Sequence, residues 1–269
     1  PRVVWDGSVL YLGQFISASR LPWDYLPVWI VVTTPLAYLV FFMMGVGRSL
    51  VRAVSGLRRF LAEPDRDLIP LAAFFGPILA VILCHAVVFD GWRHLYFVYP
   101  AFVLLAIRGV EQIAATLRRI EVRALRCTAG ALVLAGFAAP AWFIVRSHPF
   151  QNVYFNALAG DRAGLRSRFE MDYWGLSYQT ALRYVLAHDP ASRIALYDAI
   201  DVLPLINTFM LPSAERARVQ PTDLPGARYV FTTFRGRPAG YLSLAEYFSL
   251  TVDDVKILCV YRKDPTRSN

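Results

Sequence analysis

The sequence has little charge and few cysteines. Of its 269 residues 18% are charged and 56% are hydrophobic, whereas soluble domains are usually about 25% charged. Its cysteines, Cys84, Cys127 and Cys259, are far apart in the chain, which excludes a disulfide framework or a cysteine metal site. There is no HExxH, GxSxG, P-loop or GxGxxG motif. These absences argue against several classes of soluble enzyme and indicate a chain that is partly solvated by lipid.

Four apolar runs are each long enough to cross a bilayer as a helix, which takes about 20 residues. They cover about residues 26–46, 68–89, 95–113 and 127–145. One such run could be a buried helix of a large soluble protein, but four of them before residue 147 are typical of a membrane protein. The sequence therefore predicts a polytopic α-helical membrane region over residues 1–146 with four transmembrane helices.

Arginines are concentrated in two of the short loops. They are Arg48, Arg52, Arg58, Arg59 and Arg66 in the first loop, and Arg118, Arg119, Arg123 and Arg126 in the second. Because cytoplasmic loops carry an excess of basic residues, both loops are expected in the cytoplasm. The N-terminal segment, the turn at 90–94 and the chain after Arg146 are then expected outside. The net charge of +8 is explained by topology, and no nucleic-acid partner is expected.

Residues 147–269 have a different character, with frequent charges and with Gly, Pro and Asp between short runs. Strands are predicted at 193–197, 229–234 and 255–261, and helices at 176–186, 203–211 and 243–250. Strands that alternate with helices favour an α/β layer with a mostly parallel sheet. The sequence thus predicts a small periplasmic α/β domain after the membrane region.

The turn Asp90-Gly91-Trp92-Arg93-His94 is the first candidate site. It places an acid, a cation and an imidazole at one membrane interface. The planar guanidinium of Arg93 suits the oxygens of a lipid phosphate. In the alternative interpretation Arg93 reaches lipid headgroups and Asp90 simply pairs with it. Both interpretations remain open at this point.

The second candidate site follows the fourth apolar run and includes His148, Glu170, Asp172 and Trp174. Carboxylates interleaved with aromatic rings are typical of sugar-binding surfaces, although a linker folded onto the membrane interface would have a similar composition. Asp65-Arg66-Asp67 has the spacing of a DxD motif, but helix capping explains it more simply. No metal ligand set or cofactor motif is identified, and the requirement for a divalent metal stays open.

Three separate segments resemble, in the same order, bacterial family-39-type glycosyltransferases, which are relatives of the protein O-mannosyltransferases with the GT-C fold. The first is LPWDYLPVW, beginning at Leu21, followed by Thr33-Thr34-Pro35. The second is DGWRHLYF with Tyr99-Pro100. The third begins with HPFQ at His148 and ends with DYWGLSY.

The resemblance implies a bacterial inner-membrane enzyme that transfers a sugar from a polyprenyl-phosphate carrier to a glycan, lipid or protein acceptor on the outer face. It implies that Arg93 and His94 contact the donor phosphate. Sugar or acceptor contacts are implied at Trp5, Asp90, Trp92, His148, Glu170, Asp172 and Trp174. The catalytic acid of such enzymes would lie upstream of Pro1. The chain is therefore expected to be a C-terminal portion that holds no catalytic residue.

Two other functions are considered. A non-enzymatic membrane scaffold or lipid-handling subunit with an outer interaction domain would show the same hydropathy. A transporter would require ionisable residues in the middle of the membrane. His85 is the one titratable group at any depth in the apolar runs, and packing explains a single histidine well.

Overall fold

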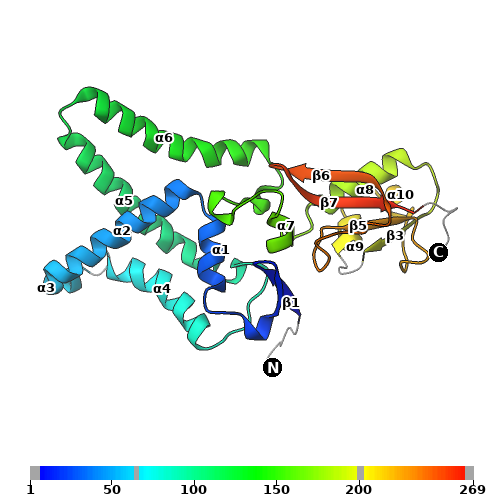
Figure 1. The fold of residues 1–269 in the computed structure, drawn as a ribbon, viewed down its shortest axis with the longest axis horizontal. Helices are drawn as coiled ribbons and strands as arrows, with labels where there is room; N and C mark the ends of the chain where they lie inside the picture. Colours follow the sequence, from blue (N-terminus) through cyan, green and yellow to red (C-terminus); the bar gives the residue numbers. More distant parts are fainter. Residues whose placement is uncertain (1–6, 64–66, 199–202, 264–269) are drawn as a thin grey trace. The chain divides into compact units, whose positions relative to one another are not determined.

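The computed structural model describes residues 7–63, 67–198 and 203–263. The chain forms two compact units (Figure 1). The first consists mainly of Ser17–Arg146 with Phe155–Ala159, and the second mainly of the chain from Gly160 with Ser147–Tyr154 and Val9–Ile16. Each unit is described by itself.

The first unit is helical. Its helices are α1 (Tyr25–Thr33), α2 (Leu36–Ser55), α3 (Leu57–Ala62), α4 (Leu68–Leu83), α5 (Tyr99–Arg119) and α6 (Arg123–Arg146), with short 3-10 turns η1 (Ala18–Arg20), η2 (Arg93–Val98) and η4 (Ala157–Ala159). Within the described ranges, three helices are long and apolar enough to cross a membrane: Leu36–Ser55, Arg93–Arg119 and Arg123–Arg146. The prediction of a helical membrane region is confirmed to this extent.

The first predicted span, 26–46, differs from the structure because Pro35 divides it. Thr34 has extended backbone angles, with φ −101° and ψ 136°, as expected for a residue before proline. The chain therefore ends α1 at Thr33 and begins α2 at Leu36, which continues nine residues past the predicted end to Ser55.

The second predicted span, 68–89, also differs, because α4 ends at Leu83. His85 takes a left-handed conformation with φ 48°, its N–H donates to the Ile82 carbonyl, and the N–H of Ala86 donates to the Val81 carbonyl. This pattern is a Schellman motif, which terminates a helix. The 16 residues of α4 rise about 24 Å, less than the roughly 30 Å of a bilayer core.

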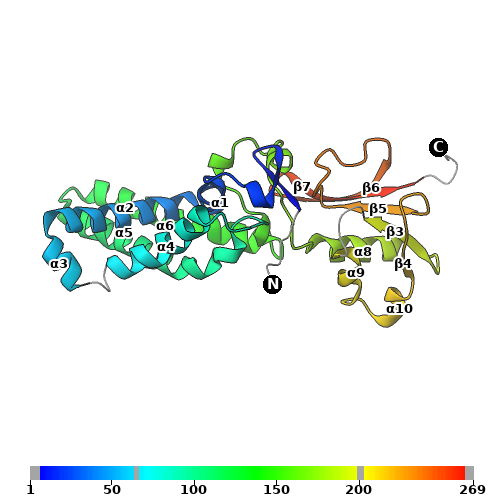
Figure 2. The same ribbon diagram turned by 90° about the horizontal axis from the view of Figure 1, so that it is seen from below.

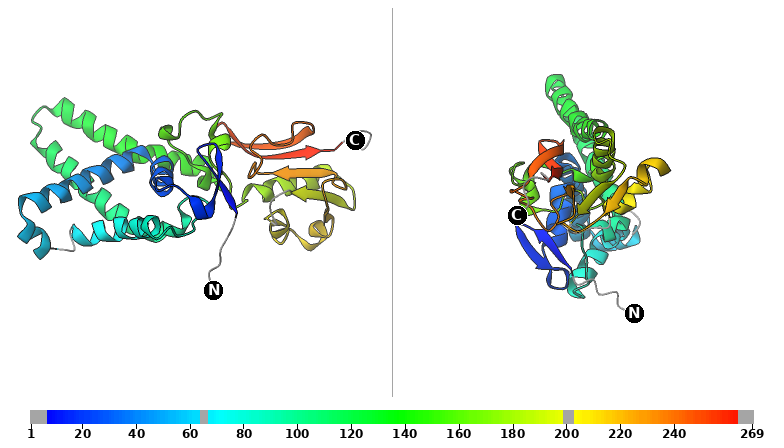
Figure 3. Two further views of the ribbon diagram at one scale, coloured as in Figure 1. Left: turned by 60° about the horizontal axis from the view of Figure 1, so that its bottom comes forward. Right: turned by 90° about the vertical axis from the view of Figure 1, so that its right-hand side faces the viewer.

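The exposed side chains of α6 indicate whether water or lipid surrounds this helix. Leu132, Leu134 and Val145 are 69–72% exposed, and only 11% of the most apolar window of the helix is buried. Contiguous apolar exposure of this size is rare on soluble monomers. The three apolar helices therefore indicate a membrane-embedded protein. In Figures 1 and 3 α5 leads up to a short connection and α6 leads back from it, so that the two helices spread apart from the connection.

Helices α2 and α5 lie side by side (Figures 1 and 2). The Phe42 ring stacks on Phe102, with centroids 4.6 Å apart, and Gly45 and Gly109 bring the two backbones close together. The Arg-rich C-terminal ends of both helices lie at the same end of the unit, and the segment that joins α4 to α5 lies at the other. This arrangement agrees with the placement of both arginine loops on one side of a membrane.

The second unit is built on a mixed five-stranded sheet. In the order β4-β3-β5-β7-β6, its strands are β4 (Val219–Pro221), β3 (Ile194–Asp198), β5 (Tyr229–Thr232), β7 (Val255–Arg262) and β6 (Ala245–Val252). The unit also contains η3 (Gln151–Val153), α7 (Leu165–Arg168), α8 (Ser177–His188), α9 (Leu203–Thr208) and α10 (Ser213–Arg216). A separate two-stranded sheet joins β1 (Ser8–Tyr11) to β2 (Gln14–Ser17).

Two predictions for this unit are wrong. The segment 243–250 is not a helix, since most of it belongs to β6, which pairs antiparallel with β7. The connecting residues Asp253 and Asp254 have φ values of 50° and 65°, which suit the tight turn of a hairpin. The sheet is also mixed rather than mostly parallel, because β3 pairs in parallel with β4 and β5 while β7 pairs antiparallel with β5 and β6.

Alternate residues of the strands fill two apolar clusters on opposite faces of the sheet. Tyr229 and Phe231 pack with Leu182 and other residues of α8, the helix that covers one face in Figure 2. Val230 and Cys259 point to the other face, which is covered by the loops around Leu224 and Tyr241. The sheet domain thus has a core of its own.

Candidate functional site

The turn at Asp90–His94 contains a partly accessible ion pair. Arg93 Nη2 lies 3.0 Å from Asp90 Oδ2, and the two side chains are 21% and 4% exposed. The guanidinium carbon of Arg93 also lies 4.8 Å from the centre of the Phe89 ring. Arg93 therefore keeps some access to solvent while Asp90 is buried, so a phosphate would approach the guanidinium rather than the carboxylate.

The backbone of the turn is held by α1. Asp90 and Gly91 have φ values of 55° and 71°, and the Gly91 N–H donates to the Tyr25 hydroxyl at 3.1 Å. A Cβ atom on Gly91 would lie 3.3 Å from the Trp29 ring, so the glycine allows both the left-handed turn and the close approach. Tyr25 and Trp29 both belong to the first of the three segments that carry the family resemblance.

Trp92 and His94 take different environments. Trp92 is 8% exposed, and its Nε1–H donates to Thr33 Oγ1 at 3.0 Å. The Thr33 hydroxyl donates in turn to the Trp29 carbonyl at 2.6 Å. His94 is exposed, with its ring edge-on to Phe89 at 4.6 Å between centroids. Trp92 thus anchors the turn on α1, while His94 stays accessible beside Arg93.

Asn156 brings part of the third segment to the same place. Its side-chain Nδ2 donates to the carbonyls of Val31 and Thr34, both at 2.6 Å, and its backbone N–H donates to the Val32 carbonyl at 2.8 Å. These bonds satisfy carbonyls left without helical partners where Pro35 ends α1. The Asp90–His94 turn, α1 and the Phe155–Asn156 dipeptide therefore form one junction. The sequence analysis did not single out Asn156 and missed this role.

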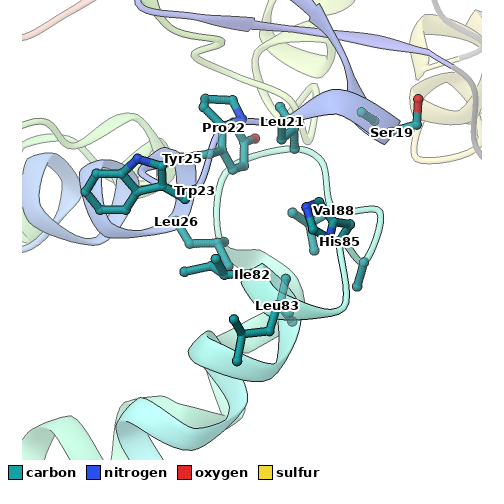
Figure 4. Close-up of a pocket in the computed structure, with 13 residues that line it drawn as sticks. Ser19, Leu21, Pro22, Trp23, Tyr25, Leu26, Ile82, Leu83, His85 and Val88 are labelled. Carbon is teal, nitrogen blue, oxygen red and sulfur yellow. The ribbon is translucent and has the colours of Figure 1, made fainter.

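A cavity of about 290 Å³ lies close to the turn. Figure 4 shows it between the segment before α1, which includes Leu21 and Pro22, and the end of α4 with the residues that follow. Its lining includes Tyr25, the residue that holds Gly91, and His85, the left-handed residue after α4. The sequence analysis treated His85 as packing, and its position beyond the helix end was not evident from apolar periodicity.

The other predicted site residues lie in the second unit. Asp172 is 1% exposed and accepts hydrogen bonds from Asn152 Nδ2 at 2.9 Å and from the N–H groups of Leu176 and Ser177 at 3.2 and 2.8 Å. The carboxylate thus stabilises the start of α8. Its predicted contact with a sugar stays a prediction, and its present bonds favour a structural role.

Glu170, Trp174 and His148 differ in accessibility. Glu170 is 4% exposed and lies 3.5 Å from Arg235 Nε. Trp174 is 48% exposed, and its ring contacts the Tyr173 ring, with centroids 5.6 Å apart. His148 is also exposed, with its Nδ1 2.9 Å from Gln151 Nε2. Trp174 is therefore the one of the three with a large accessible ring. The predicted residue Trp5 lies outside the described residues.

Asp67, the residue of the DxD-like motif that the structure describes, has a structural role. Asp65 and Arg66 lie outside the described residues. Asp67 is 2% exposed, is paired with Arg52 and accepts a hydrogen bond from the Ser49 hydroxyl at 2.6 Å. Among the described residues no group of three or more His, Cys, Asp or Glu side chains could hold a metal ion.

Three side chains in and beside the sheet core, Tyr229, Cys259 and Asp189, have shifted pKa values. Burial raises the pKa of Tyr229, and the hydrogen bond from its hydroxyl to Asp189 raises it further. Burial also raises the pKa of Cys259 to about 11. Burial opposes ionisation of Asp189, but the N–H of Ala191, the Tyr229 hydroxyl and Arg228 outweigh it and lower its pKa. These shifts keep the tyrosine and thiol neutral and the carboxylate charged, which suits packing rather than acid–base chemistry.

No family model, curated protein or solved structure matches this chain.

Proposed function

We propose that the chain is the C-terminal part of a membrane glycosyltransferase that uses a polyprenyl-phosphate-linked sugar, and that Arg93 contacts the phosphate of the carrier. The observation that carries the proposal is the junction around the Asp90–His94 turn. Residues of all three family-like segments meet there, although they are separated by up to 125 positions in the chain. The guanidinium of Arg93 has several N–H donors suited to the oxygens of a phosphate. Because the Arg93 side chain is only 21% exposed, its hydrogen bonds are stronger than they would be in open water.

The proposed topology places the enzyme in the bacterial inner membrane as a multi-pass protein. In it α4 and the apolar residues after it act as a fourth span, shortened by the Schellman motif at His85. The Arg-rich ends of α2 and α5 face the cytoplasm by the positive-inside rule. The Asp90–His94 turn and the sheet domain then lie outside, where the acceptor would be a glycan, lipid or protein. Site-directed labelling of single cysteines with a membrane-impermeant maleimide tests this orientation.

The functional test compares three arginine variants of the full-length protein reconstituted with a polyprenyl-phosphate-linked sugar. Arg93→Ala should lower sugar transfer at least tenfold, about the effect of one charge-assisted hydrogen bond of 1.5–3 kcal/mol. Arg146→Ala, which removes a cation at the exposed end of α6, serves as the matched control and should retain activity. Arg93→Lys should give an intermediate rate because it keeps the charge and loses the planar fork.

Thermal melts of the three variants separate loss of fold from loss of function. If Arg93→Ala keeps the wild-type melting temperature and the wild-type transfer rate, the phosphate role is wrong.

A non-enzymatic lipid-handling subunit is the second candidate. It is favoured by the internal pairing of Arg93 with Asp90 and by the apolar cavity beside the turn. Under this alternative the full-length protein would bind lipid in the cavity but transfer no sugar from any polyprenyl-phosphate donor.

A further inference from the structure

The cavity at the end of α4 has no charged residue in its lining. Its 13 lining residues come from the segment 18–26 and from the segment 81–88, and none of them is Arg, Lys, Asp or Glu. A volume of about 290 Å³ lies just below the usual range for ligand pockets, about 300–1,000 Å³. The cavity is thus large enough for one hydrocarbon chain and unsuited to an anionic headgroup.

Ser19 and His85 place polar groups on one side of the cavity, in addition to the Tyr25 hydroxyl that accepts a hydrogen bond from Gly91. Figure 4 shows Leu26, Ile82 and Leu83 together on one side, while His85 and Ser19 lie toward the other. Ser19 has a hydroxyl partner in Ser17 at 2.9 Å. The imidazole of His85 can donate or accept a hydrogen bond, and its residue is exposed at the cavity. The lining is therefore amphipathic, with an apolar body and a hydrogen-bonding end.

The conformation of His85 is a second and independent observation. Its φ of 48° lies in the left-handed region, where glycine is free of steric cost and other residues are not. The Schellman motif at this position requires that conformation, but it does not require a side chain. Residues held in such conformations cluster at ligand sites. A histidine at this position therefore points to a use for its ring.

The setting in the membrane supports the same conclusion. After α4 ends, residues 84–92 contain no α-helix although most of them are apolar. Non-helical backbone at the depth of a bilayer is tolerated where it is buried in protein or lines a water-filled cavity. Residues 85–88 line this cavity in part, so its end at His85 is expected to be hydrated and to take the polar end of a ligand.

We propose that this cavity binds the hydrocarbon chain of an uncharged lipid alcohol, with the hydroxyl group hydrogen-bonded to His85. The lack of a cation distinguishes the site from the turn at Arg93, which suits a phosphate. The proposal does not depend on sugar transfer, since it uses only the lining, the backbone at His85 and the membrane setting.

The test uses the full chain in phospholipid nanodiscs and a diazirine-bearing analogue of hexadecanol. After irradiation, mass spectrometry of peptides locates the label. Labelling is expected in the peptides that contain 18–26 and 81–88, and excess hexadecanol should suppress it. Hexadecyl phosphate, which carries the same chain with an anionic head, should compete at least about tenfold less well, a difference of about 1.4 kcal/mol.

Two pairs of proteins test the residues. Ala86→Phe fills the cavity and should abolish labelling, whereas Ala80→Phe changes an exposed alanine of α4 outside the lining and should not. His85→Gly keeps the left-handed backbone and removes the imidazole. It should lower labelling by the alcohol about fivefold, the equivalent of one neutral hydrogen bond, and leave labelling by a diazirine alkane unchanged.

Three results would overturn the proposal. One is labelling spread evenly over the exposed apolar faces of α2, α5 and α6. Another is equal competition by hexadecyl phosphate, which would identify a phosphate-bearing lipid as the ligand. The third is unchanged labelling in Ala86→Phe. Because Arg93→Ala should leave this labelling intact, failure of the cavity and failure of the glycosyltransferase proposal can be told apart.

Discussion

The close contact of α2 and α5 leads to a sharp prediction about Gly45. A Cβ atom on Gly45 would lie 1.8 Å from the Leu105 carbonyl oxygen. A Cβ on Gly109 would likewise lie 1.9 Å from the Phe41 carbonyl oxygen. Small residues of this kind allow membrane helices to approach closely and pack without a hydrophobic driving force. Substitution of either glycine should therefore separate the two helices.

The loss of stability expected for Gly45→Ala follows from how close its Cβ would lie to the Leu105 carbonyl oxygen. Carbon and oxygen atoms of this kind do not approach closer than 3.0 Å, so a Cβ at 1.8 Å requires α2 and α5 to separate by about 1.2 Å or to rotate. Overpacking of this kind costs about 1–3 kcal/mol. Replacing glycine by alanine in a helix returns up to about 1 kcal/mol of helix propensity. Gly45→Ala should thus destabilise the chain by a net amount of about 1–2 kcal/mol.

Gly47→Ala is the matched control. It lies on the same helix, and a Cβ there would meet no atom within 4 Å. This variant should be neutral or slightly stabilising, since it retains the propensity gain without the clash. The two alanine substitutions should therefore change the free energy of unfolding differently, with a loss for Gly45→Ala and no loss for Gly47→Ala.

The assay is thermal unfolding of the purified chain in detergent, followed by intrinsic fluorescence or size-exclusion chromatography. A change of 1–2 kcal/mol corresponds to a melting temperature lower by about 2–8 °C in a protein of this size. Equal melting temperatures for Gly45→Ala and Gly47→Ala would refute the reasoning, because the clash would then have no consequence for packing.

Three further predictions concern buried polar groups, each checked by chemical unfolding of the purified chain. Asp67→Ala leaves Arg52 without its buried partner and should lower the free energy of unfolding by about 2 kcal/mol. The loss is smaller than for a fully buried ion pair because the Arg52 side chain is 24% exposed. An unchanged unfolding midpoint would contradict this prediction. Asn156→Ala removes two side-chain bonds to the end of α1 and should cost about 2 kcal/mol at about 1 kcal/mol for each, and limited proteolysis should then cut near Pro35 more quickly. The lowered pKa of Asp189 means that its ionised form stabilises the folded state above its ordinary value of 3.8, and that this contribution disappears as the pH falls through the lower folded value. Tyr229→Phe removes one of the donors that lower this pKa and should reduce the loss of stability in acid; an identical acid dependence in both proteins would exclude the role of this bond.

Local patterns in the sequence predicted several elements well. The helical spacing over 176–186 corresponds to α8, and the β-branched run at 255–261 corresponds to β7. The helical spacing of α8 matches the one side on which it packs, and the short apolar run of β7 matches a strand that is buried on both faces of the sheet. The prediction of the segment 243–250 as a helix was wrong because β6 owes its form to pairing with β7 across the Asp253-Asp254 turn.

The predicted transmembrane spans also show what local sequence patterns leave undetermined. Pro35 is visible in the sequence, but apolar content alone does not locate the end of a helix. The end of α4 depends on backbone hydrogen bonds around His85, a residue that carries no strong helix-stop signal, in contrast to glycine.

Composition by itself indicated that the chain is embedded in a membrane, and charge placement predicted that its Arg-rich ends share one side, because hydropathy and charge act through the solvent, whatever the tertiary contacts. They also marked the Asp90–His94 turn as a place where acid, cation and imidazole stand together. Only the tertiary structure decided what holds that turn. Its partner Tyr25 lies 66 positions away, and Asn156 reaches back over more than 120 positions to the end of α1. Such contacts depend on how helices pack around glycine and proline, and no local periodicity encodes them.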